Sequence, residues 1–333
     1  MIPDRRGTPL VERMHALRTL LAVAPMLLPA LATAQPVATE GALDLVLPTG
    51  ARAVALGQAT MALDGTTESV WGNPSGLARM RGTTAAIHHS QSIGGTADAV
   101  AVVAHSRVLG SFGVSASLRD FGPSTNSDNS GTEGGTILPR SLIYAATYAA
   151  SLDRLNVGLS YKLVQWRLDC SGPCTGETGI MASTSAMDAG AQVSLDPLLP
   201  VRVGASVRNV GLPMQVNDQP QADELPARLQ AGLELRVPGV DEMVGGTELR
   251  VSADMVSDLR RIDPSPRLGA ELAWQRMIHI RGGYASPDAG FGGPSLGVGY
   301  EKGNLAIDFA RLFDDVSSAT GAEPTYLSVR YRF

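Results

Sequence analysis

Beyond its first 34 residues the sequence has no long apolar run. No later segment approaches the roughly 18 consecutive apolar residues that a transmembrane helix needs, so a helical membrane protein is excluded. Lysine is rare and the net charge is −5. Without a basic patch there is no case for a nucleic-acid partner.

Aromatic residues make up only 5% of the chain, and cysteine occurs twice. The scarcity of aromatics argues against a membrane β-barrel, or requires that its two interfacial girdles be thin. The cysteines sit in the tight turn sequence Cys170-Ser-Gly-Pro-Cys174. In an oxidising compartment this predicts a local disulfide between Cys170 and Cys174, because a metal site would need further ligands and none is adjacent. The girdle candidates are Phe112, Tyr144, Tyr148, Tyr161, Tyr284, Tyr300, Phe309 and Tyr331.

Catalytic motifs are also missing. There is no G-x-S-x-G, no H-E-x-x-H and no P-loop. His88 and His89 point to opposite faces of a strand and cannot share a metal. The run from Asn126 to Gly131 partly resembles a calcium loop, but Ile137 stands where a bidentate glutamate is required. We therefore expect neither an enzyme nor a metal or cofactor site.

The N-terminus has the pattern of a secretory signal peptide. Arg18 precedes the apolar stretch Leu20 to Leu31, and Ala32-Thr33-Ala34 follows as a small-x-small cleavage site. The stretch is too short and too proline-containing for a membrane anchor. We expect residues 1–34 to be removed on export; the spacing also suggests that Met14, rather than Met1, is the true start.

From about residue 84 onward apolar and polar residues alternate, which predicts strands with two different faces. In Val201 to Asn209, Val203 and Val207 share one face while Arg202 and Ser206 share the other. Most such segments have about nine to eleven residues, enough to cross a bilayer at a tilt. The pattern predicts an all-β fold, an antiparallel outer-membrane β-barrel of about 14 strands over residues 84–333. The segments begin near Thr84, Asp98, Ser111, Ser141, Asn156, Ser185, Val201, Ala227, Thr247, Arg267, Ile278, Ser295, Asn304 and Thr325.

The connections between these segments alternate between short and long. Outer-membrane barrels have short periplasmic turns and longer extracellular loops. With an even number of strands, both chain termini lie on the periplasmic side. Short connections are expected at 107–110, 152–155, 196–200, 275–277 and 301–303, and long ones at 121–140, 170–184, 211–226, 257–266, 286–294 and 314–324; one connection of the short class, 238–246, is longer than expected.

The last segment, Tyr326 to Phe333, places its aromatic end on the apolar face. A terminal aromatic on an amphipathic strand resembles the signal read by the barrel-assembly machinery, so Phe333 is the predicted assembly signal. Membrane lipid is the second partner that the barrel implies.

Residues 35–83 do not alternate, and residues 50–80 within them consist mostly of small residues with turns at Asp64-Gly65 and Asn73-Pro74. We expect this segment to fill the barrel lumen as a plug, starting at the periplasmic mouth because it directly precedes strand one; a periplasmic tail is the alternative. Acidic plug residues Asp64 and Glu68 would pair with lumen charges, since paired charges tolerate confinement better than single ones. The candidates are Arg202, Arg208, Arg228, Arg250, Arg281 and Arg330.

The same run resembles the N-terminus of the PorV/PorQ group of outer-membrane proteins, which is related to the FadL-type transporters of hydrophobic compounds. The matching residues are Gly50-Ala51-Arg52-Ala53, Leu63-Asp64, and Trp71-Gly-Asn73-Pro74-Ser-Gly76-Leu-Ala78. Similar stretches recur at 203–211, 225–232 and 280–284, so the resemblance covers nearly all of the mature chain. It implies a fourteen-stranded barrel with an N-terminal hatch whose motif is Asp64, Trp71, Asn73, Pro74 and Gly76. Ser75 and Gly65 depart from the usual pattern and weaken any transfer of a specific substrate.

Two functions follow from the resemblance. The first is uptake of a hydrophobic small molecule across the outer membrane, through a lateral opening or past the hatch. The second is a role in a type IX-like secretion pathway, with a secreted protein as client. An open diffusion porin is disfavoured by the plug-like segment.

Overall fold

The computed structural model describes residues 40–92, 94–127, 133–172, 180–195, 200–216, 222–260, 263–288, 291–314 and 323–333. The predicted signal peptide lies outside the described residues, and so do Cys174 and most of the calcium-like loop. Among the described residues, no helix is long and apolar enough to span a membrane.

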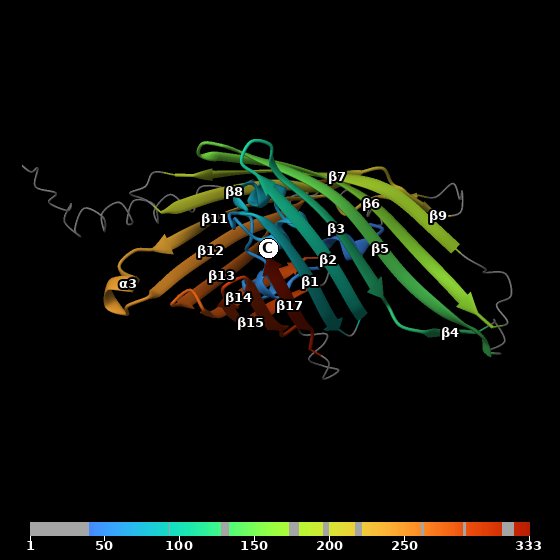
Figure 1. Cartoon of the computed structure of the whole chain (residues 1–333). Coiled ribbons are helices and arrows are strands. Elements are labelled where there is room, and N and C mark those ends of the chain that lie inside the picture. The colour runs from blue at the N-terminus through green and yellow to red at the C-terminus, as the bar shows by residue number, and fades with distance from the viewer. Residues whose placement is uncertain are drawn as a thin grey trace, which may run out of the picture. The chain divides into compact units, whose positions relative to one another are not determined.

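Fourteen long antiparallel strands close into a barrel, because β1 pairs with β17 as well as with β2 (Figure 1). Each of the fourteen predicted segments corresponds to one of these strands, so the predicted number is confirmed. The long strands are β1 (Thr83–Ser92), β2 (Gly95–Ser106), β3 (Gly110–Asp120), β5 (Glu133–Leu152), β6 (Leu155–Ser171), β7 (Ile180–Ser194), β8 (Val201–Gly211), β11 (Arg228–Val237), β12 (Thr247–Asp258), β13 (Ser265–Trp274), β14 (Ile278–Asp288), β15 (Phe291–Lys302), β16 (Leu305–Leu312) and β17 (Thr325–Arg332).

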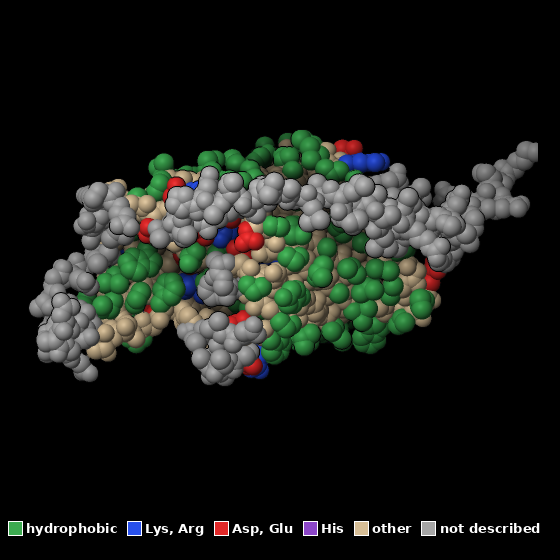
Figure 2. All heavy atoms as spheres, turned by 180° about the vertical axis from the view of Figure 1, so that it is seen from behind, with side chains coloured by type: hydrophobic (Ala, Val, Ile, Leu, Met, Phe, Trp, Pro, Cys, Tyr) green, Lys and Arg blue, Asp and Glu red, His purple; other side chains and the backbone are tan. Residues whose placement is uncertain are grey.

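The two faces of the barrel wall are chemically opposite. Along β11, Leu229 and Leu233 are exposed, whereas Gln230 and Glu234 are buried. Figure 2 shows hydrophobic side chains over much of the outer surface on one side. An apolar outside and a polar inside are what a barrel in lipid requires, because its outer side chains meet hydrocarbon rather than water.

The wall extends further at the long-loop end than the sequence predicts. β5, β6 and β7 have 20, 17 and 15 residues, and the short strand β4 (Ser124–Ser127) pairs with the start of β5. The expected loop 121–140 is therefore largely a hairpin. Likewise, β14 and β15 together leave only residues 289–290 between them where a loop over 286–294 was expected. Alternation of apolar residues marks only the part of a strand that faces lipid, so it misses such extensions.

The other connections agree better with their expected lengths. The short strands β9 (Met214–Val216) and β10 (Ala222–Asp223) lie within the expected long loop 211–226. The overlong short-class connection at 238–246 contains the helical turn α3 (Val240–Met243). Turns at 107–109, 153–154, 275–277 and 303–304 join strands at the opposite, short-turn end.

Residues 40–82 lie inside the barrel as a plug made of four short helical pieces, shown blue in Figure 1. These are η1 (Leu43–Val46), α2 (Ala51–Ala55), η2 (Thr67–Val70) and η3 (Pro74–Arg79). The direction of the plug is not the expected one. Glu40 contacts Arg228 at the long-loop end of β11, whereas Arg79 contacts the turn residue Asp153. The plug thus starts at the long-loop end and runs toward the short-turn end. Its contacts with the wall, rather than its position just before strand β1, decide where it begins.

Candidate functional site

The turn at Asn73-Pro74 is held by several hydrogen bonds of one side chain. The side-chain oxygen of Asn73 accepts hydrogen bonds from the backbone N–H and the hydroxyl of Ser75, at 3.1 and 2.7 Å. This caps η3, whose first residue is Pro74, a position that tolerates proline well. The side-chain NH2 of Asn73 donates to the carbonyls of Met61, at 2.7 Å, and of Ala191 in β7, at 3.3 Å. One buried amide therefore caps a helix, closes the plug on itself and attaches it to the wall.

Of the other two motif residues near this turn, Trp71 contacts the wall and Gly76 contacts the plug itself. Trp71 packs edge-on against His88 of β1, with ring centroids 5.1 Å apart. The carbonyl of Gly76 accepts a hydrogen bond from the N–H of Gly65 at 2.9 Å. A Cβ at Gly76 would lie 2.7 Å from the carbonyl oxygen of Leu63, so only glycine fits there.

Residues 60–64 of the plug are held by polar side chains of the wall. Asp254 of β12 accepts hydrogen bonds from the backbone N–H groups of Thr60 and Met61, at 2.7 and 3.0 Å. Gln192 of β7 donates to the carbonyls of Met61 and Leu63, at 2.8 and 2.7 Å. These contacts satisfy plug backbone groups that form no regular secondary structure and would otherwise be buried without partners.

Asp64 forms the ion pair that the sequence predicts, with the Arg202 guanidinium 2.8 Å away. Glu68 forms no ion pair among the described residues. Its carboxyl is buried with one oxygen unbonded. Burial raises the pKa of Glu68, against the opposing effect of the guanidinium group of Arg330.

A row of alternating charges connects the plug to four strands. The Arg52 guanidinium contacts Glu271 of β13, which also binds Arg281 of β14 at 2.5 Å. Arg281 then contacts Asp308 of β16 at 2.7 Å, and Arg330 of β17 completes the row at 3.3 Å. All five side chains are largely buried. Burial is tolerated here because each charge has an opposite neighbour.

The remaining predicted lumen arginines do not form one site. Arg228 binds Glu40, Asp258 and Asp288 near the long-loop end. Arg208 donates to the carbonyl of Trp71 and to Gln230. Arg250 pairs with Glu248 in its own strand. Arg228 and Arg208 thus contact the plug at separate places, whereas the ion pair of Arg250 among the described residues is with the wall.

Lumen-facing glycines form a seat for the plug that the sequence analysis missed. Where the plug backbone passes the wall, an added Cβ would overlap Met61 at Gly204, Leu56 at Gly269 and Gly57 at Gly283. The sequence did contain a signal for this seat. Glycine at inward-facing positions of otherwise regular strands indicates that another backbone approaches closely. These glycines are Gly158, Gly190, Gly204, Gly269, Gly283 and Gly297.

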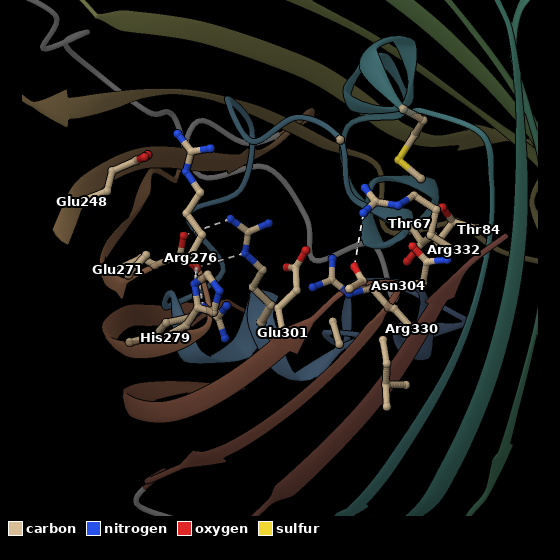
Figure 3. A pocket seen from close by; sticks show the side chains of 18 of the residues that line it. Thr67, Thr84, Glu248, Glu271, Arg276, His279, Glu301, Asn304, Arg330 and Arg332 are labelled. Carbon is tan, nitrogen blue, oxygen red and sulfur yellow. Dashed lines mark hydrogen bonds and ion pairs between the residues drawn. The ribbon is translucent and has the colours of Figure 1, made fainter. Parts of the chain in front are cut away.

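A cavity of about 270 Å³ lies between the plug and the wall at the short-turn end (Figure 3). Polar and charged groups dominate its lining, which includes Arg52 and Gly65 of the plug and Glu301 and Arg330 of the wall. Three smaller cavities of about 20, 10 and 40 Å³ lie beside residues 44–50 of the plug. The three smaller cavities are too small to hold a drug-sized ligand.

Two predicted residues lie away from the lumen. Phe333 is 73% exposed, with its ring 5.0 Å from that of Tyr331 and its N–H donating to the carbonyl of Thr83. Cys170 is the penultimate residue of β6. Its predicted partner Cys174 lies outside the described residues, so the disulfide stays a prediction.

The barrel is similar in fold to solved FadL-type outer-membrane transporters. The Ralstonia pickettii toluene transporter TbuX has a TM-score of 0.57 and 15% identity, over 86% of this chain and 98% of TbuX. The monoaromatic hydrocarbon channel CymD has a TM-score of 0.56 and 15% identity, over 86% and 98%. A Pseudomonas aeruginosa FadL homologue has a TM-score of 0.51 and 12% identity, over 89% and 100%.

The other comparisons are negative. No family model matches the sequence, and no curated protein is similar to it. The similar structures support the FadL side of the resemblance; they give no support to its narrower PorV/PorQ part or to a secretion role.

Proposed function

We propose that the chain is an outer-membrane transporter that takes up small hydrophobic compounds, with the plug as its gate. The observation that carries the proposal is the plug itself. Residues 40–82 fill the lumen of a FadL-type barrel and are anchored to strands on several sides. A channel that only admitted polar solutes by diffusion would have no use for such an obstruction. The PorV/PorQ resemblance, with a secreted protein as client, stays a sequence-based hypothesis.

The first experiment tests uptake. Cells that produce the protein should accumulate radiolabelled toluene, used as a probe of the hydrophobic class, faster than cells with an empty vector. A sugar of similar size should enter equally slowly in both. Toluene uptake no faster than in the vector control would contradict the proposal.

A second experiment tests the plug as an obstruction. Deletion of residues 50–80 should raise single-channel conductance in planar bilayers well above that of the intact protein. If the intact protein already conducts as an open pore and the deletion changes nothing, the diffusion-porin alternative gains instead.

Plug movement can be tested separately with a cross-link. Asp44 of the plug accepts a hydrogen bond from the Ser141 hydroxyl in β5, so their side chains face each other. The cross-link is an Asp44→Cys, Ser141→Cys pair in a background without native cysteines. Uptake should fall when this pair is oxidised and should recover when it is reduced. Thr147→Cys, Ser160→Cys is the matched control, because these hydroxyls are 2.8 Å apart within the wall. Unchanged uptake with the plug cross-linked would show that this part of the plug stays in place during transport.

A further inference from the structure

Arginine side chains outnumber carboxylates in the lining of the 270 Å³ cavity at the short-turn end. Its lining includes six guanidinium groups and three carboxylates, from Glu248, Glu271 and Glu301. Asp308 contacts two of these guanidinium groups from behind the lining, and the plug carboxyl of Glu68 interacts electrostatically with Arg330, Arg52 and Arg281. With both acids counted, the six arginines still exceed the carboxylates by one. The six arginines are Arg52, Arg250, Arg276, Arg281, Arg330 and Arg332.

Three of these arginines have N–H donors to spare. Arg330 contacts Asp308 through one nitrogen at 3.3 Å, and its buried Nε has no hydrogen-bond partner among the described residues. Arg332 donates to the carbonyl of Gly303 at 3.3 Å and forms no ion pair with a described residue. Arg276, in the turn between β13 and β14, is exposed and has no partner in the described part of the chain.

These donors border one space. Figure 3 shows Glu301, Arg330 and Arg332 pointing into the cavity, with Asn304 beside them. The turn residues Gly303 and Asn304 are exposed, so solvent and solutes reach the cavity from the short-turn end. Glu301 is the one cavity carboxylate without an ion-pair partner among the described residues, and it opposes the binding of an anion.

We propose that this cavity binds a small oxyanion, a phosphate or a carboxylate group, beside Arg330 and Arg332, with Arg276 adding positive charge to the same lining. Guanidinium groups match the geometry of these anions and bind them through charge-assisted hydrogen bonds. The confined cavity strengthens the attraction because it is partly shielded from water. The bound anion satisfies the spare donors and relieves the repulsion between neighbouring guanidinium groups.

Calorimetric titration of the purified protein with inorganic phosphate, in a non-ionic detergent at low salt, tests the site. Arg330→Gln should weaken binding roughly tenfold, the effect of losing one charge-assisted hydrogen bond. Arg276→Gln should weaken phosphate binding less. Because Arg276 is exposed and has no partner among the described residues, this substitution should not disturb folding. Arg107→Gln, in another turn at the same end, is the matched control and should bind as the wild type does.

The variant Glu301→Gln should bind phosphate more tightly, because it removes the opposing charge. No heat of binding at millimolar phosphate, or binding that Arg330→Gln and Glu301→Gln leave unchanged, overturns the proposal. Acetate and benzoate separate two sources of the anion. Equal affinity for both indicates recognition of a free oxyanion, whereas tighter binding of benzoate indicates the head group of an amphipathic molecule. Because binding is measured without transport, failure here leaves the uptake proposal standing, and the reverse also holds.

Discussion

Both carboxylate oxygens of Glu271 in the wall accept hydrogen bonds from the Arg52 guanidinium in the plug, each at 3.2 Å. The two side chains are only 5% and 10% exposed. Breaking such a buried pair from one side leaves an uncompensated charge, which destabilises by about 3–5 kcal/mol. The pair therefore ties the plug to β13 more firmly than a surface ion pair could.

Replacing the acid in this pair should loosen the plug. Glu271→Gln leaves both Arg52 and Arg281 without their shared carboxylate, so the variant should show higher conductance and faster protease cleavage within residues 40–82. Arg311→Gln breaks a partly exposed pair with Glu323 near the long-loop end and serves as the control. Equal cleavage rates in the two variants would mean that the Arg52–Glu271 pair does not hold the plug.

Adjacent glycines in β14 provide a second test of the plug seat. A methyl group at Gly283 would overlap the backbone of Gly57, whereas one at Gly282 would meet Leu296 at an ordinary 3.6 Å. Gly283→Ala should displace the plug and raise conductance, and Gly282→Ala should behave as the wild type. The same result for both variants would show that the plug does not need this close approach.

The outer face can be tested at Ala231, which lies directly opposite Ala205 in the β8–β11 pair and is exposed. Ala231→Arg should destabilise the folded barrel by about 2–4 kcal/mol if this position meets the bilayer midplane. Urea unfolding in lipid vesicles measures the change. Ser206→Arg, on the opposite face, should instead crowd Met61, whose sulfur lies 3.1 Å from the Ser206 hydroxyl. A barrel that tolerates Ala231→Arg without loss of stability would contradict a lipid-facing position.

The sequence predicted the wall far better than the plug. Alternation is a local pattern that lipid and lumen impose on every strand, so fourteen strands could be located without knowing their partners. The plug has no such period. Its direction depends on distant contacts such as Glu40 with Arg228, and no local signal reports these. Charge complementarity predicted the partner of Asp64 but failed for Glu68, because the choice among many lumen arginines is made by packing.

The exposed terminal aromatic leads to a prediction about assembly. Phe333 contributes little to packing, since its ring contacts Tyr331 at the edge of the barrel. Phe333→Ala should therefore leave the stability of the folded barrel unchanged and still lower its yield in cells, by slowing recognition of the last strand. Heat-modifiable gel mobility separates folded from unfolded protein. A normal yield in cells would show that the residue is no assembly signal.

The buried carboxyl of Glu68 makes the seating of the plug depend on pH. Burial raises its pKa above the ordinary value of 4.5, and the nearby Asp308 adds to this; Arg330, Arg52 and Arg281 oppose it. A raised pKa means that the seated plug prefers the protonated carboxyl. The contribution of Glu68 to the stability of the seated plug is therefore fully present below the ordinary pKa, and it is lost as the pH rises through the raised pKa.

Hydrogen exchange of the plug amides, corrected for intrinsic rates, should accordingly be slower at pH 5 than at pH 8. Glu68→Gln, which mimics the protonated form, should keep the slow exchange at both values. Asp44 is a second buried plug carboxyl whose pKa burial raises, so Asp44→Asn is the necessary comparison. If Asp44→Asn alone abolishes the pH dependence, Glu68 is not the responsible group. If the wild type exchanges equally at both values, neither carboxyl controls the plug, and the charges around Glu68 compensate its burial fully.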